Sequence, residues 1–145
     1  MPPRQRNTDD EGSVLVLTLG YAVLAVALLV VAVNATSLAL AQHRLEAVAD
    51  AAALAGADGF ELHLAADDGE PVVVLADADV HAQAAALVSV AADAGDDVRL
   101  VDAGTPDGVS ARVVVASTWR PILLSPFVPG GVALSAEAIA RTAAG

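Results

Sequence analysis

Histidine and carboxylate side chains are the groups in this sequence that could bind a metal ion or move a proton. The three histidines, His43, His63 and His81, are 20 and 18 residues apart, so no pair has the spacing that places two imidazoles on one helix face. A zinc site would need folding to bring His63 and His81 together with an acid. Solvated surface histidines are the simpler interpretation, and we predict no metal site.

Four aspartates lie close together in the sequence: Asp67 and Asp68, then Asp77 and Asp79. A calcium loop needs a glycine and a distal glutamate at fixed positions after its D-x-D element, and neither follows Asp79 at the required offset. A weak cation site is the alternative. We predict instead that Asp77 or Asp79 caps the start of a helix.

The motifs of nucleophilic and nucleotide chemistry are missing. No serine stands in a G-x-S-x-G context, and the sequence has no lysine with which to build a phosphate-binding P-loop. The absence of cysteine excludes disulfides, thiol catalysis and cysteine-based zinc sites. The net charge of −11 argues against nucleic-acid binding. We therefore predict that the chain is not an enzyme and uses no cofactor, small-molecule substrate or nucleic acid.

A long apolar run dominates the N-terminal part of the chain. The 21 residues from Ser13 to Val33 contain no charge, and the uncharged stretch continues to Gln42. As a helix these 21 residues would span about 30 Å, the thickness of a bilayer's hydrocarbon core. The sequence therefore predicts a transmembrane helix over residues 13–34, preceded by a leader of residues 1–12.

The arginines on either side of the run predict its orientation. Arg4 and Arg6 precede it, whereas Arg44 is the one basic residue that follows soon after. Because basic residues favour the cytoplasmic side, we predict a cytoplasmic N-terminus and an extracytoplasmic C-terminal domain in the cell membrane. The alternative is a secretory signal cut before Gln42, although this run is longer than the apolar core of about 7–15 residues in such signals.

Beyond Asn34 the apolar positions become one-sided, with alternating spacings of three and four residues. Such spacing lies along one face of a helix. The resulting helix packing stripe consists of Leu38, Ala41, Leu45, Val48, Ala52 and Ala55. Because no proline interrupts the segment before Gly56, we predict one helix from Ser13 to Ala57, with residues 35–59 as its amphipathic extension. The stripe packs on the C-terminal domain, on helices of other copies, or on both.

The remaining residues, 60–145, predict a small α+β domain. Asp58–Pro71 is predicted as a loop, and Val72–Leu75 is a short apolar run of either type. A second helix is expected over Val80–Ala94, ended by Gly95.

Three strands complete the predicted domain. One lies around Val98 and Leu100, and the others cover Val109–Trp119 and Val132–Thr142. The connections are a turn at Gly104–Gly108 and a proline-rich loop, Pro121–Gly131. Short connections of this kind favour an antiparallel three-stranded sheet.

The N-terminal half resembles a known family. The step Glu11-Gly12-Ser13 into an apolar helix, followed by LEAVADAAALA over Leu45–Ala55, resembles the TadE/TadG-like proteins of the tight-adherence (Flp) pilus systems. The resemblance covers roughly Asp10–Asp58, and the proline-rich loop between two C-terminal strands is also similar. It implies a minor pilin or pilus-assembly component with a type IV pilin-like shape. Its implied partners are the membrane and other pilus or secretion-system subunits, which contact the N-terminal helix.

The resemblance also marks a candidate processing site. Prepilin peptidases cut after glycine at the border of the apolar helix, which here is the Gly12–Ser13 bond. Pilins usually carry glutamate at the fifth mature position, whereas Leu17 stands there in this chain. We therefore predict that the bond is cut inefficiently or not at all, and that the helix remains as an anchor.

The function predicted from these observations is that of a membrane-anchored structural or assembly component of a Tad-type pilus or secretion apparatus. Two alternatives stay open. One is a membrane-anchored extracytoplasmic binding module unrelated to pili, and the other is a domain secreted after signal cleavage.

Overall fold

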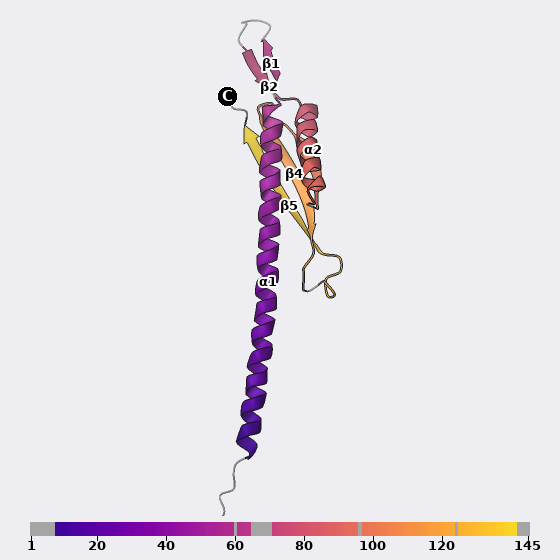
Figure 1. Cartoon of the computed structure of the whole chain (residues 1–145). Coiled ribbons are helices and arrows are strands. Elements are labelled where there is room, and N and C mark those ends of the chain that lie inside the picture. Colours follow the sequence, from indigo (N-terminus) through magenta and orange to yellow (C-terminus); the bar gives the residue numbers. More distant parts are fainter. Residues whose placement is uncertain (1–7, 60, 65–70, 96, 124, 142–145) are drawn as a thin grey trace, which may run out of the picture.

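One long helix and a small sheet make up most of the molecule (Figure 1). The computed structural model describes residues 8–59, 61–64, 71–95, 97–123 and 125–141. Helix α1 (Thr8–Asp58) has 51 residues, which corresponds to a length of about 75 Å. Its C-terminal part lies along the sheet, and its N-terminal part extends well beyond it.

Helix α1 begins five residues before the predicted start at Ser13. The sequence is consistent with the earlier start, because the acids Asp9, Asp10 and Glu11 follow Thr8. Acids in the first turn of a helix are favoured by the positive end of its dipole. The charged segment before the apolar run is therefore part of the helix.

A β-hairpin follows α1, where we expected a loop. Strand β1 (Glu61–Leu64) pairs antiparallel with β2 (Pro71–Val74), in a register that sets Glu61 opposite Val74. The loop prediction for Asp58–Pro71 is therefore wrong at residues 61–64, and also at Asp58, which ends α1, and at Pro71, which begins β2. A four-residue strand is too short for a clear alternation, and it becomes recognisable only through its valine-rich partner.

Helix α2 (Asp77–Asp93) begins three residues before the predicted Val80. The expected capping role of Asp77 or Asp79 is wrong, because the residue at the N-cap is Ala76 and no side chain caps the helix. Both aspartates instead lie in the first turn, where the helix dipole favours a carboxylate. Gly95 follows the helix with φ of 101°, a conformation that glycine adopts without strain.

The main sheet has the order β3-β4-β5 and is antiparallel throughout. Its strands are β3 (Val98–Gly104), β4 (Ser110–Trp119) and β5 (Val132–Arg141). The predicted α+β fold, with a long N-terminal helix, a second helix and a three-stranded antiparallel sheet, is confirmed. Thr142, the predicted last residue of β5, lies outside the described residues.

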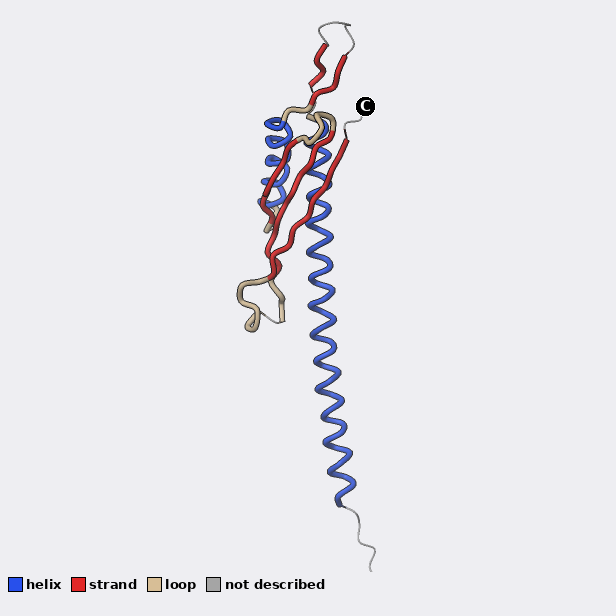
Figure 2. Tube along the Cα trace, turned by 180° about the vertical axis from the view of Figure 1, so that it is seen from behind, coloured by secondary structure: helices blue, strands red, loops and turns tan. Residues whose placement is uncertain are grey.

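Both helices cover the same face of this sheet (Figure 2). Helix α1 contacts β4, β5 and α2, and α2 also contacts β3. Small side chains form most of the core between these layers: Leu45, Ala49, Ala52, Ala53 and Ala57 from α1, Val80, Ala84 and Val88 from α2, Ala111, Val113 and Val115 from β4, and Ala136 and Ala138 from β5. The part of α1 from Leu45 to Ala57 thus contributes to the small domain's core.

Candidate functional site

The apolar half of α1 extends away from most of the described chain. Its large apolar side chains from Val14 to Val33 are exposed, apart from the half-buried Val30, with Leu24 at 54% and Leu28 at 62%. Among the described residues, α1 is the one helix long and apolar enough to cross a membrane, and none of its most apolar segment is buried. The core helix of a soluble protein would instead be buried, so this surface needs an apolar environment from outside the chain.

The candidate processing bond lies inside this helix. Gly12 and Ser13 are helical and exposed, four residues after the start of α1 at Thr8. A Cβ atom built onto Gly12 would meet no heavy atom within 4 Å. The bond is therefore accessible from the side, but its backbone is held in a helical rather than an extended conformation.

The helix packing stripe lies on the side of α1 that faces the small domain. Leu45 and Ala52 are fully buried, and the other four members, Leu38, Ala41, Val48 and Ala55, are partly buried. The stripe thus contacts the chain's own domain.

The buried face of α1 also contains residues that the stripe did not include. Ala49, Ala53 and Ala57 are buried, and so is Gly56. A Cβ atom at Gly56 would lie 3.0 Å from Cγ1 of Val80 and 3.3 Å from Cβ of Ala111. Gly56 therefore lets α1 approach both α2 and β4 closely. Its position within the apolar pattern of the helix could have indicated this from the sequence.

Two polar contacts join α1 to the sheet where the helix emerges from its apolar half. The indole Nε1 of Trp119 donates a hydrogen bond to Oγ of Ser37 at 3.1 Å. Farther along, Nε2 of Gln42 donates to the backbone oxygen of Ser135 at 3.3 Å. These bonds tie β4 and β5 to the helix and supplement the contacts of small apolar side chains.

Asn34 marks the border between the two halves of α1. Its side chain is 5% exposed, and its Nδ2 donates to the backbone oxygen of Val30 at 2.8 Å. Its Oδ1 is buried with no hydrogen-bond partner in the part of the chain that the structure describes. Nothing in the sequence pattern distinguished Asn34 from an ordinary boundary residue.

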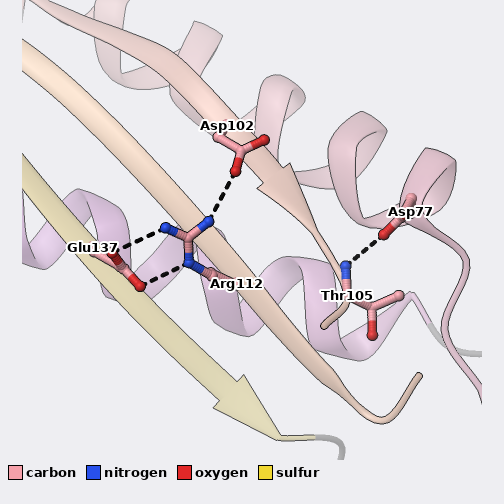
Figure 3. A network of polar contacts seen from close by, with 5 residues as sticks. All are labelled: Asp77, Asp102, Thr105, Arg112 and Glu137. Carbon is pink, nitrogen blue, oxygen red and sulfur yellow. Dashed lines mark hydrogen bonds and ion pairs between the residues drawn. The ribbon is translucent and has the colours of Figure 1, made fainter. Parts of the chain in front are cut away.

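An ion network crosses the other face of the sheet (Figure 3). Arg112 on β4 donates from Nε to Oε1 of Glu137 at 2.7 Å and from Nη1 to Oδ2 of Asp102 at 2.9 Å. The hydrogen bonds and positive charge of Arg112 lower the pKa of Glu137 below its ordinary value. The network links all three strands, and its groups satisfy one another rather than a substrate.

Asp77 connects α2 to the same sheet. Its Oδ1 accepts a hydrogen bond of 2.6 Å from the backbone N–H of Thr105, just beyond the end of β3 (Figure 3). This contact gives Asp77 a structural role in place of the predicted cap. Asp67 and Asp68, the other two acids of the sequence cluster, lie outside the described residues.

The histidines stand on separate elements. His43 is on α1, where its Nδ1 lies 3.1 Å from Oε2 of Glu46, while His81 is on α2 and His63 belongs to β1. Within the described residues, no group of three histidine or acidic side chains is arranged to hold a metal ion.

Comparison with known proteins found one similarity, and it lies in the long helix. The Tad family model, described as Flp pilus-assembly TadE/G-like, matches residues 12–59, which is nearly all of α1 and about a third of the chain. No curated protein and no solved structure matches the chain. The match covers the exposed apolar half and the packed half of the helix together. Residues 12–59 are therefore similar to the TadE/G-like segment of Flp pilus-assembly proteins.

Proposed function

We propose that this chain is a membrane-anchored structural or assembly component of an Flp pilus system, similar to a minor pilin. The observation that carries the proposal is the division of one helix, α1, into two halves with different environments. Nearly all large side chains from Val14 to Val33 are exposed and apolar, whereas Leu45 and four alanines after it are buried in the core. A helix of this kind holds a folded domain at a fixed position next to a bilayer.

The proposed orientation has the N-terminus in the cytoplasm and the sheet outside the cell membrane. Arg4 and Arg6 precede the apolar run, and Arg44 alone follows it closely. Acidic residues contribute little to this preference, so the negative charges near Glu11 do not reverse it.

The proposed role is structural rather than catalytic. Arg112, Glu137 and Asp77 are engaged in contacts between strands and between α2 and the sheet. The sequence has no P-loop lysine, so any ATP hydrolysis that drives assembly belongs to a partner protein. The proposed partners are the membrane and other pilus or secretion-system subunits that contact α1.

A complementation experiment tests the role. Deleting the gene in its own bacterium should reduce or abolish Flp pili, counted by electron microscopy, and the unaltered gene should restore them. Replacing Leu24 and Leu28 with aspartate costs about 2.5–3.5 kcal/mol per residue at the centre of a membrane, so this variant should not restore pili. Leu54→Asp is the matched control, because Leu54 is 56% exposed on the same helix beyond the proposed membrane segment.

The outcomes separate the role from the anchor. Normal pili in the deletion strain would reject the pilus function. Restoration by the Leu24→Asp, Leu28→Asp variant would reject the membrane anchor. Protease added to intact spheroplasts should degrade the domain, and a protected domain would reverse the proposed orientation.

A further inference from the structure

The loop between β4 and β5 exposes apolar side chains at the end of the sheet nearest the apolar half of α1. The exposed fractions of its large apolar residues are 69% for Ile122, 49% for Leu123, 81% for Phe127 and 37% for Val128. No residue from Pro121 to Gly131 is charged. Phe127 is one of four aromatic residues in the whole chain. Because its side chain is mostly exposed, it contributes little of the stabilisation that a buried aromatic side chain gives.

The start of the loop lies next to α1. Ile122 lines a shallow apolar groove together with Ala32, Val33 and Leu40 of the helix. Ala32 and Val33 are the last residues of the 21-residue apolar run. Both views of the molecule place this loop at the end of the sheet from which the apolar half of α1 continues (Figure 1, Figure 2).

We infer that the β4–β5 loop inserts Phe127 and its apolar neighbours into the outer surface of the bilayer that α1 spans. The inference rests on the proposed membrane anchor. If residues 13–33 fill the hydrocarbon core, then Ala32 and Val33 lie at its outer boundary, and the groove that they form with Ile122 lies at the same depth. The domain then contacts the membrane at two places, through the helix and through the loop.

The chemistry of the loop favours lipid as its occupant. Pro121, Pro126 and Pro129 have no backbone N–H, so the loop is poorly suited to add a strand from another chain. Arg120 is exposed directly before the loop and lies at the level where lipid phosphates would meet its guanidinium group. An aromatic residue between apolar side chains and a neighbouring cation is typical of segments that lie at a membrane interface.

Depth measurement by spin labelling tests the inference on the full chain. The sequence has no cysteine, so single cysteine variants carry one label each. The variants are Phe127→Cys in the loop, Ile139→Cys as the matched control, and Leu24→Cys as a reporter of the anchor. Ile139 is a suitable control because it is 62% exposed but lies seven residues along β5 from Val132, about 23 Å from the loop.

The labelled proteins are placed in vesicles of phosphatidylethanolamine and phosphatidylglycerol. Collision rates of each label are then measured with oxygen, which concentrates in lipid, and with a water-soluble nickel complex. We expect the label at position 24 to be protected from nickel and open to oxygen. The label at 127 should show the same preference to a smaller degree, and the label at 139 should show the opposite preference.

Each contrary result has one meaning. A label at 127 as accessible to nickel as the one at 139, with position 24 still protected, overturns the loop insertion and leaves the anchor intact. A label at 24 accessible to nickel overturns the anchor and the loop insertion together. Spin–spin broadening at 127 that disappears on dilution with unlabelled protein shows that a second copy covers the loop, and this also overturns the inference.

Discussion

At the scale of single residues, Leu45 is the largest side chain that α1 contributes to the core, and it is 1% exposed. Truncating a buried leucine to alanine removes apolar contacts and leaves a cavity, which typically destabilises a protein by about 2–5 kcal/mol. We therefore predict that Leu45→Ala lowers the melting temperature of the detergent-solubilised protein markedly, as followed by circular dichroism.

The control for this prediction is Leu54→Ala on the same helix. Leu54 is 56% exposed, so its truncation should change stability by less than about 1 kcal/mol. Equal melting temperatures for the two variants would mean that α1 does not pack on the sheet through Leu45.

The Arg112–Glu137 pair predicts a dependence of stability on pH. The pKa of Glu137 is lowered in the folded protein, chiefly by hydrogen bonds from Arg112 and then by its charge. Ionised Glu137 therefore contributes stability that is fully present above its ordinary pKa of 4.5 and is lost as pH falls through the lower folded-state value. We predict that Glu137→Gln makes the loss of stability below that pH less steep, as measured by thermal melts over a pH series.

An exposed carboxylate away from the pair serves as the control. Asp58→Asn at the end of α1 removes one negative charge, as Glu137→Gln does, but does not alter the Arg112–Glu137 pair. A parallel change in both variants would assign the effect to net charge rather than to the pair.

At the scale of elements, the long helix and the paired strands were predictable because each has a strong pattern of its own. The uncharged run from Ser13 is long enough to indicate a helix that spans a membrane. The alternation of Ala111, Val113 and Val115 indicates a strand with one face in the core, and these three residues of β4 are buried. Strand β1 was missed because Glu61–Leu64 is short and is stabilised by its pairing with β2. Such pairing depends on residues distant in the sequence and leaves little local signal.

The buried face of α1 shows a similar limit for the candidate site. The spacing from Leu38 to Ala55 defines a single line along the helix. Because α1 packs against α2 as well as against two strands, Ala53 and Gly56 beside that line are buried too. The width of a packing face depends on how many elements it contacts, which the helical period alone does not report.

The position of the Gly12–Ser13 bond predicts slow processing. A prepilin-type peptidase must bind this bond as an extended chain, and the bond lies within the first two turns of α1. We predict that most of the membrane-extracted protein keeps its N-terminus intact, as shown by N-terminal sequencing. A mature chain that starts uniformly at Ser13 would contradict this prediction and favour a fibre subunit.

Two variants test which residues control cleavage of the Gly12–Ser13 bond. If the bond is cut, Gly12→Leu should abolish the size shift on a gel, because the peptidase requires glycine before the cleaved bond. The fold should tolerate the substitution, because Gly12 has open space around it. Leu17→Glu restores the glutamate usual in pilins and should increase cleavage if its absence is the reason for retention.

At the scale of the whole molecule, the core of the domain formed by residues 60–145 includes side chains of α1, which precedes that domain in the sequence. Five α1 residues, from Leu45 to Ala57, belong to the buried core. We predict that a fragment beginning at Leu38 melts at a higher temperature than one beginning at Phe60, since the shorter fragment exposes the helix-covered face of the sheet. Calorimetry of the two fragments measures this, and equal melting temperatures would mean that the sheet and α2 fold without α1.

The continuity of α1 also determines how the molecule responds to force. No proline lies between Ser13 and Ala57, and the helix runs unbroken across the border between its two halves. A helix without a kink transmits a displacement along its axis from one end to the other. If the apolar end of α1 is drawn out of the bilayer, the sheet therefore moves by the same distance. If α1 tilts in the bilayer, the end of the domain farthest from the membrane moves the most.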